Sequence, residues 1–185
     1  MKSDKKLLGL FMLGAFKHGS CQVPENKKDA LISRLELFAN NEAELPEEDT
    51  KGVRAKINKT ETKDYRYYFY HEHYKTFTRS TEKEREKFYK LIKDNKTRAD
   101  SIIECCVHFY KVIEVHEGYV IADNIFLEES KELILTNICG QIKKGDTVSA
   151  HYPQLMEVVD DIDKIDFYKD ELYKLLKGLS NNLRK

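Results

Sequence analysis

The segment 109–159 alternates apolar and polar residues in short runs, and this alternation constrains the fold more than any other feature of the chain. Turn-forming sequences such as HEG and IKKG separate the runs. Period-two alternation is typical of strands with one buried face, and tight turns between such strands favour antiparallel pairing. The five runs are FYKVIEV, YVIADNIFL, KELILTNI, DTVSAHY and LMEVV. We therefore predict a small five-strand antiparallel sheet or barrel over about residues 109–159.

The first 45 residues are predicted to form an N-terminal helical segment. Residues 7–16 read LLGLFMLGAF and follow three lysines, as in a signal peptide, but no cleavage pattern of small residues comes after them. Ten apolar residues are also too few for a membrane span, which needs about 20. We expect a retained helix, either buried or docked on a partner, in a cytoplasmic protein, with export by an atypical signal as the alternative. A second helix is expected after Pro24, because Leu31, Leu35 and Phe38 share one helical face.

The rest of the chain is divided by composition and by helical periodicity. Residues 46–64 are polar and contain one proline and one glycine, so we expect a loop or linker there. Residues 65–185 are expected to form an α+β core that includes the sheet. Within it, a capping-box pattern and apolar spacing predict a helical pair over 81–106. An apolar stripe over 162–179, behind an Asp-rich start, predicts a C-terminal amphipathic helix.

Charge is distributed unevenly along a chain whose formal net charge is zero. Residues 51–98 carry 15 basic and 7 acidic side chains, a balance of +8, whereas residues 99–171 carry 6 basic and 16 acidic ones, a balance of −10. The basic part favours an anionic partner, and two oppositely charged parts of one fold that neutralise each other are the alternative. The four cysteines have no regular spacing, which favours free thiols in a reducing compartment.

The segment 65–77 reads YRYYFYHEHYKTF and is predicted to form a Tyr-rich strand. Phe69, His71 and His73 would then share the face without permanent charges, so we expect them on the more buried side. The opposite face would present tyrosines beside arginine. Aromatic rings between basic residues are typical of surfaces that bind single-stranded nucleic acid, while ordinary cross-strand tyrosine pairs are the alternative. The candidate residues for such a surface are Arg66, Tyr68, Tyr70, Tyr74, Lys75 and Arg79.

Histidines in the same segment are weak candidates for a metal site. His71 and His73 lie at strand spacing, a geometry that can hold Zn²⁺ if further ligands join them. His108, His116 and Cys106 are conceivable donors, but no CxxC or HExxH pattern accompanies them. We therefore assign no metal site and expect no cofactor.

A thiol nucleophile would need a histidine close to a cysteine. Cys139 and His151 are spaced so that they can meet across neighbouring strands. Cys139 follows an apolar run, however, and a buried structural thiol is the commoner environment of such a cysteine. We favour the structural thiol.

These observations favour a non-enzymatic binding protein over an enzyme. The basic, aromatic central segment is the expected working surface, with single-stranded nucleic acid as its ligand. The alternative is a protein–protein adaptor or regulatory protein that uses the apolar N-terminal segment or the C-terminal helix, and a homodimer through that helix is a related expectation. An enzyme of unknown class is the third hypothesis.

Overall fold

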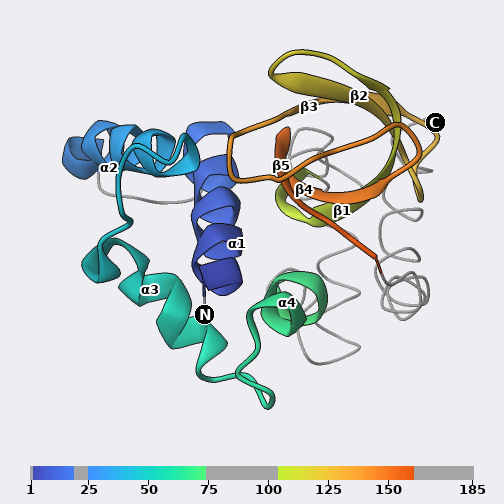
Figure 1. Ribbon diagram of the computed structural model, residues 1–185. Coiled ribbons are helices and arrows are strands. Elements are labelled where there is room, and N and C mark those ends of the chain that lie inside the picture. Colours follow the sequence, from blue (N-terminus) through green and yellow to red (C-terminus); the bar gives the residue numbers. More distant parts are fainter. Residues whose placement is uncertain (1, 19–24, 74–103, 161–185) are drawn as a thin grey trace, which may run out of the picture.

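The computed structural model describes residues 2–18, 25–73 and 104–160 of the chain (Figure 1). Within these residues, the helical elements lie before residue 74 and the strands begin at Val107. The helical elements are α1 (Lys2–Leu13), the π-helical turn η1 (Gly14–His18), α2 (Glu25–Ala39), α3 (Glu47–Ile57), α4 (Tyr65–Tyr67) and the π-helical turn η2 (Tyr68–Glu72). The strands are β1 (Val107–Val115), β2 (Tyr119–Asn124), β3 (Ser130–Ile134), β4 (Thr147–His151) and β5 (Gln154–Val158). The predicted α+β class is confirmed.

The strands form one mixed five-strand sheet rather than the purely antiparallel one that we predict. The pairs β1–β2, β1–β4, β2–β3 and β4–β5 are antiparallel, as the short turns imply. Between β3 and β5 there is a single parallel pair, Ile134 with Gln154. The sheet curls until these two strands meet, so the strand order β1–β2–β3–β5–β4 returns to β1. Glycines with positive φ, Gly118 at 82° and Gly145 at 89°, lie in the turns that precede β2 and β4.

Helix α1 stands between helices α2 and α3 on one side and the sheet on the other (Figure 1). Every residue from Leu7 to Ala15 is buried, which is typical of a helix that is apolar on all sides and packed on all sides. Two glycines allow the close packing. A Cβ atom at Gly9 would lie 2.2 Å from the Phe38 ring of α2, and one at Gly14 would lie 2.3 Å from the carbonyl oxygen of His151 in β4. The expectation of a buried N-terminal helix is therefore confirmed, and its apolar residues are covered by the chain itself.

The expected loop over 46–64 is wrong for Glu47–Ile57, which form α3. Only Thr50 and Ile57 of this helix are buried, so its apolar period is too weak to recognise. Charge specifies the helix instead: its first turn carries three acidic residues and its last turn two basic ones, which complement the helix dipole. A bidentate pair from Arg34 to Asp49, with both N–O distances 2.7 Å, joins α3 to α2.

The predicted Tyr-rich strand is also wrong, because residues 65–72 form α4 and η2. Asp64 caps the N-terminus of α4, and its carboxylate accepts a hydrogen bond from the backbone N–H of Tyr67 at 2.7 Å. Tyr68, Phe69 and Tyr70 are all buried, which three consecutive residues of a one-sided strand cannot be. Aromatic residues occupy so many positions here that helical and strand periods are both satisfied.

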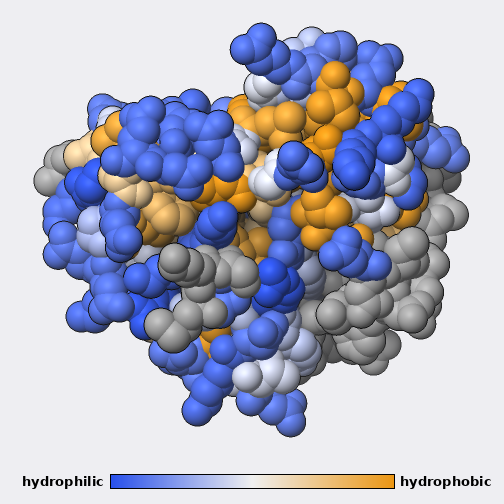
Figure 2. Space-filling model, in the orientation of Figure 1, coloured by the Kyte–Doolittle hydropathy of each residue, from blue (hydrophilic) through white to orange (hydrophobic). Residues whose placement is uncertain are grey.

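Other expected elements lie outside the described residues, namely most of the helical pair over 81–106 and the C-terminal helix over 162–179. In the described part of the chain, no helix combines the length and the apolar character needed to cross a membrane. Figure 2 shows mostly hydrophilic residues over α2 and α3, whereas apolar residues gather over the sheet. Val115 and Ile125 are among the large apolar side chains exposed there.

Candidate metal centre between helix α1, turn η2 and the sheet

Three side chains from distant parts of the sequence converge beneath α1. One ligand atom from each of His73, Cys105 and His151 lies within 4.8 Å of the other two. Among the described residues, this is the group of three or more metal-ligating side chains that the fold brings together. Their exposed fractions are 9 %, 7 % and 0 %, so the group belongs to the core and not to the surface.

Sheet register and a helix end bring the three residues together. His151 closes β4 and pairs with Val107 of β1, and Cys105 precedes that pair by two residues on the β1 side. His73 follows η2, and its backbone N–H donates to the carbonyl oxygen of Tyr68 at 2.8 Å. The π-helical turns η1 and η2 both adjoin the cluster, and such turns are rare and occur frequently at functional sites.

The backbone carbonyl of Cys105 lies at the centre of the cluster. Nε2 of His73 and Nε2 of His151 are each 3.1 Å from this oxygen. The Cys105 Sγ atom is 3.8 Å from Nε2 of His73. On its other side, Nδ1 of His151 lies 2.9 Å from the carbonyl oxygen of Phe11 in α1. Both Nε2 atoms and the sulfur therefore face the same small region.

Burial keeps both imidazoles in the neutral form. Desolvation, and then the neighbouring His151 ring, lower the pKa of His73 to about 3. Desolvation lowers the pKa of His151 to about 4, against the opposing effect of its two backbone hydrogen bonds. A neutral imidazole keeps a lone pair on one ring nitrogen, which is the form that binds metal ions.

Aromatic rings surround the two histidines. The Phe11 ring stacks on His151 with centroids 4.1 Å apart and an interplanar angle of 4°, and it stacks on Phe69 at the same centroid distance. His73 meets the edge of Phe11 at 4.9 Å. Tyr152 lies beside His151 at 4.9 Å. This shell excludes water, which strengthens interactions with any charge placed inside it.

Of the metal-site predictions, His73 lies in the cluster, whereas the suggested partner residues do not. Nδ1 of His108 bonds to the side-chain amide of Asn124 at 3.2 Å, and Nε2 of His116 lies 3.0 Å from a Glu114 carboxylate oxygen. Burial raises the pKa of Cys106 to about 12. The side chain of His71 lies outside the described part. The donors that complete the group, Cys105 and His151, are absent from that prediction.

The pairing of Cys139 with His151, the less favoured alternative for this cysteine, does not form. The Cys139 sulfur lies 3.1 Å from Oγ1 of Thr136 and 3.4 Å from the carbonyl oxygen of Leu155. Burial raises the pKa of this thiol. Cys139 is thus a buried thiol, as favoured on the sequence, and His151 is turned towards Cys105 instead.

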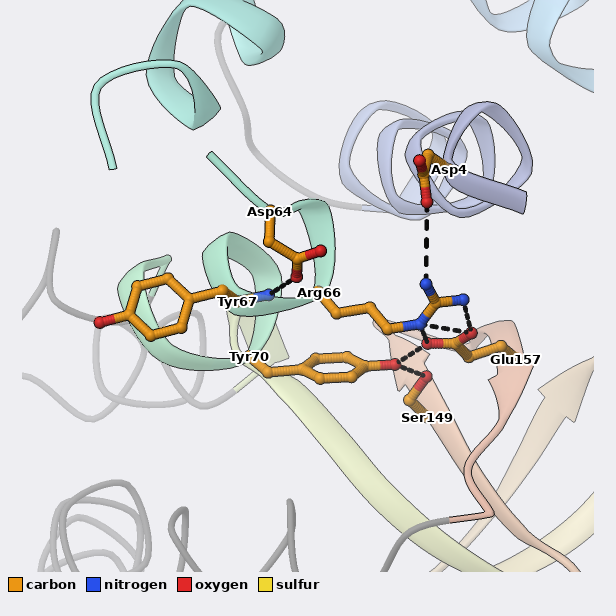
Figure 3. A network of polar contacts seen from close by, with 7 residues as sticks. All are labelled: Asp4, Asp64, Arg66, Tyr67, Tyr70, Ser149 and Glu157. Atoms are coloured by element: carbon orange, nitrogen blue, oxygen red, sulfur yellow. Dashed lines mark hydrogen bonds and ion pairs between the residues drawn. The ribbon is translucent and has the colours of Figure 1, made fainter. Parts of the chain in front are cut away.

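The residues proposed to bind nucleic acid are placed differently from the expectation. Tyr68 and Tyr70 are 5 % and 3 % exposed, so they are core residues and not a stacking surface. Arg66 reaches from α4 to Glu157 of β5, with its Nη2 atom 2.6 Å from the carboxylate, and to Asp4 of α1 at 3.7 Å (Figure 3). The correction follows from the helical conformation of the segment, which buries both rings and packs Tyr70 on Phe109 of the sheet. Tyr74, Lys75 and Arg79 lie outside the described residues.

Comparison with known proteins gives no relative on which to base a function: no family model, curated protein or solved structure matches the chain.

Proposed function

We propose that this chain is a metal-binding protein that holds one transition-metal ion, Zn²⁺ in the first place, through Nε2 of His73, Sγ of Cys105 and Nε2 of His151. The observation that carries the proposal is the convergence of these three donors within 4.8 Å in a buried aromatic shell. Imidazole nitrogen and thiolate sulfur are the ligands that Zn²⁺ prefers in proteins.

The distances suit a tetrahedral ion. Zn–N bonds of about 2.0 Å and Zn–S bonds of about 2.3 Å place nitrogen and sulfur about 3.5 Å apart at the tetrahedral angle. The Cys105 sulfur and Nε2 of His73 are 3.8 Å apart. These two side chains therefore need only a small adjustment to hold the ion, and the remaining pairs of donors lie within 4.8 Å. Binding would displace the thiol proton of Cys105 to solvent, because thiolate is the ligand form.

A hydrogen bond outside the donor set also supports the proposal. Ligating histidines commonly donate their other ring N–H to a carboxylate or a backbone carbonyl, which fixes the tautomer and the ring orientation. Nδ1 of His151 lies 2.9 Å from the Phe11 carbonyl oxygen, so this partner is in place. With Nδ1 protonated, the lone pair of His151 is on Nε2 and faces the cluster.

The fourth donor has a candidate within the cluster. The Cys105 carbonyl oxygen lies 3.1 Å from both Nε2 atoms, close enough to contact an ion placed between them. Two histidines and one cysteine with a weakly held oxygen are also typical of Cu²⁺ sites. The identity of the ion is therefore an outcome of the experiment, with Zn²⁺ as the expected one.

Titration of chelator-treated protein tests the proposal. We expect Zn²⁺ to bind at one equivalent and Co²⁺ to give the intense absorption of a cobalt–thiolate bond. Because the donors are buried, the ion is supplied both to native protein and during refolding. Cu²⁺ is titrated in parallel.

Two matched pairs of variants distinguish binding at the cluster from binding at other cysteines and histidines. Cys105→Ser should abolish the cobalt–thiolate absorption, whereas Cys139→Ser, which removes another buried thiol, should leave it unchanged. His151→Asn should weaken binding, and His116→Asn, at an exposed histidine, should not. Absence of stoichiometric binding in the parent protein, or full binding by Cys105→Ser, contradicts the proposal.

Two earlier hypotheses stay predictions. Binding of single-stranded nucleic acid now depends on Tyr74, Lys75 and Arg79, and an adaptor role depends on residues 161–185. All of these lie outside the described residues.

A further inference from the structure

The His151 ring lies between two backbone carbonyl groups and can satisfy only one of them. Nδ1 is 2.9 Å from the Phe11 oxygen and Nε2 is 3.1 Å from the Cys105 oxygen. A neutral imidazole carries one N–H group, so in each tautomer one carbonyl oxygen faces a bare nitrogen. The ring is 0 % exposed, and water is not available to correct the mismatch.

The choice of tautomer decides which structural element His151 holds. Protonation at Nδ1 directs the hydrogen bond to Phe11 and therefore to α1. Protonation at Nε2 directs it to Cys105 and leaves the Phe11 carbonyl opposite a lone pair. The end of α1 and the start of η1 rest on the sheet at this residue, because the Phe11 ring stacks on His151 and Gly14 lies against the His151 carbonyl.

An ion bound to Nε2 removes this ambiguity, because the nitrogen that holds the ion cannot also hold a proton. We infer that metal binding locks His151 in its Nδ1–H tautomer and thereby fastens helix α1 to strand β4. The inference rests on the metal function proposed above. On this inference, the ion regulates how firmly the N-terminal helix docks on the sheet.

Thermodynamic linkage adds a reciprocal prediction, the effect of α1 docking on ion binding. If the ion strengthens the docking of α1 by some factor, docking of α1 must strengthen ion binding by the same factor. One net hydrogen bond corresponds to a factor of about 3 to 10. Substitutions in α1 or η1 that replace no ligand should therefore alter the affinity for the ion by this factor.

Amide hydrogen exchange measures the effect of the ion on the docking of α1. Any ligand slows exchange that occurs through global unfolding, so the readout is the difference between α1 and β2, a strand outside the cluster. We expect Zn²⁺ to slow exchange over Leu7–Leu13 by about 3- to 10-fold more than over Tyr119–Asn124. Cys105→Ser should show no such difference. Equal slowing of the two segments in the parent protein overturns the inference.

Two alanine variants measure the effect of α1 docking on the affinity for the ion. Gly14→Ala places a Cβ atom 2.3 Å from the His151 carbonyl and should push α1 away, whereas Gly52→Ala adds a Cβ atom in α3 that meets nothing within 4 Å. We expect Gly14→Ala to weaken Co²⁺ binding about 3- to 10-fold and Gly52→Ala to leave it unchanged. Unchanged affinity in folded Gly14→Ala overturns the inference.

Nitrogen NMR of the histidine rings needs no variant and decides the matter if Gly14→Ala does not fold. We expect the Nδ1–H tautomer of His151 in the Zn²⁺-bound protein, and an Nε2–H tautomer overturns the inference. Failure of the proposed function looks different, because then no ion binds to the parent protein. Stoichiometric binding without preferential protection of α1 rejects the inference and leaves the metal function standing.

Discussion

Two polar clusters join the segment 64–73 to the sheet, and their buried polar groups are paired in different ways. In the first, Arg66 faces the carboxylate of Glu157, which also accepts the Tyr70 hydroxyl, and Ser149 lies 2.9 Å from the same hydroxyl (Figure 3). Cations and hydroxyl donors are matched to anionic acceptors. The second cluster collects imidazole nitrogens and a thiol around one carbonyl.

The difference indicates what each cluster can do. A matched network is complete, so it contributes to stability and orientation and has no need of a ligand. A group of neutral electron-pair donors gains most from a cation, because the donors cannot neutralise one another. The two clusters should therefore respond differently to metal ions, to acid and to the removal of single side chains.

The largest expected effect is the response to metal ions. At a free Zn²⁺ concentration about 1,000 times the dissociation constant, the free energy of unfolding should rise by about 4 kcal/mol. The chain has no tryptophan, so urea unfolding is followed by far-UV circular dichroism. The same ion should give no increase for Cys105→Ser. Glu157→Gln, in the matched cluster, should keep the full increase, and its loss there would remove the distinction between the clusters.

Acid should destabilise the metal-free protein through the histidine cluster. The folded-state pKa values of His73 and His151, about 3 and about 4, lie below the ordinary 6.5. The unfolded chain therefore takes up protons first, and stability present above pH 6.5 is lost as the pH falls towards 4. The loss at pH 5 should be about 2 kcal/mol per histidine. Unfolding in chelator between pH 7.5 and 5 measures it, with exposed His116→Asn as the control, and a flat profile would contradict it.

Removal of the carboxylate charge should weaken the matched cluster by a smaller amount. Glu157→Gln leaves Arg66 with only its longer contact to Asp4, at 3.7 Å. Both Arg66 and Glu157 are partly exposed, at 35 % and 20 %. Solvent screening limits the expected loss to about 1–2 kcal/mol of unfolding free energy. Urea unfolding at pH 7 gives the value. The control is Glu114→Gln at an exposed carboxylate, which should change stability by less than about 0.5 kcal/mol.

The smallest effect is expected from the hydroxyl pair. Tyr70→Phe removes the hydrogen bonds of the hydroxyl to Ser149 and to Glu157. The bond to Ser149 should account for about 1 kcal/mol of the unfolding free energy. In a double-mutant cycle with Ser149→Ala, the coupling energy should be about 0.5–1 kcal/mol. Additive effects of the two substitutions would show that the hydroxyl groups act independently, and that the network is less connected than its geometry indicates.

The sheet could be predicted because alternation is a local property. Its closing contact could not, since the parallel pair of Ile134 with Gln154 depends on the curl of the whole sheet. For the Tyr-rich segment, composition hides the period, and the deciding feature is the single cap at Asp64. The capping residue and the charge order of α3 are present in the sequence, and they could have predicted both helices.

The candidate metal centre could be predicted only in part. His73 is recognisable as a possible ligand, but its partners follow from the register of β1 against β4. Alternation already begins at Val107, two residues before the predicted strand, and Val107 pairs with His151. A strand prediction that began at Val107 would have placed Cys105 near the end of β4. The approach of α1 depends on packing at Gly14 and has no signal in the local sequence.

The contact between Phe11 and His151 joins residues that are 140 positions apart, which matters while the protein is being made. Ribosomes add about 5–20 residues per second, so α1 must wait roughly 7–28 seconds before its binding surface on β4 has been synthesised. During that time the apolar run Leu7–Ala15 has no sheet to cover it. The nascent chain should therefore be most prone to aggregation, and most dependent on chaperones, before β4 leaves the exit tunnel.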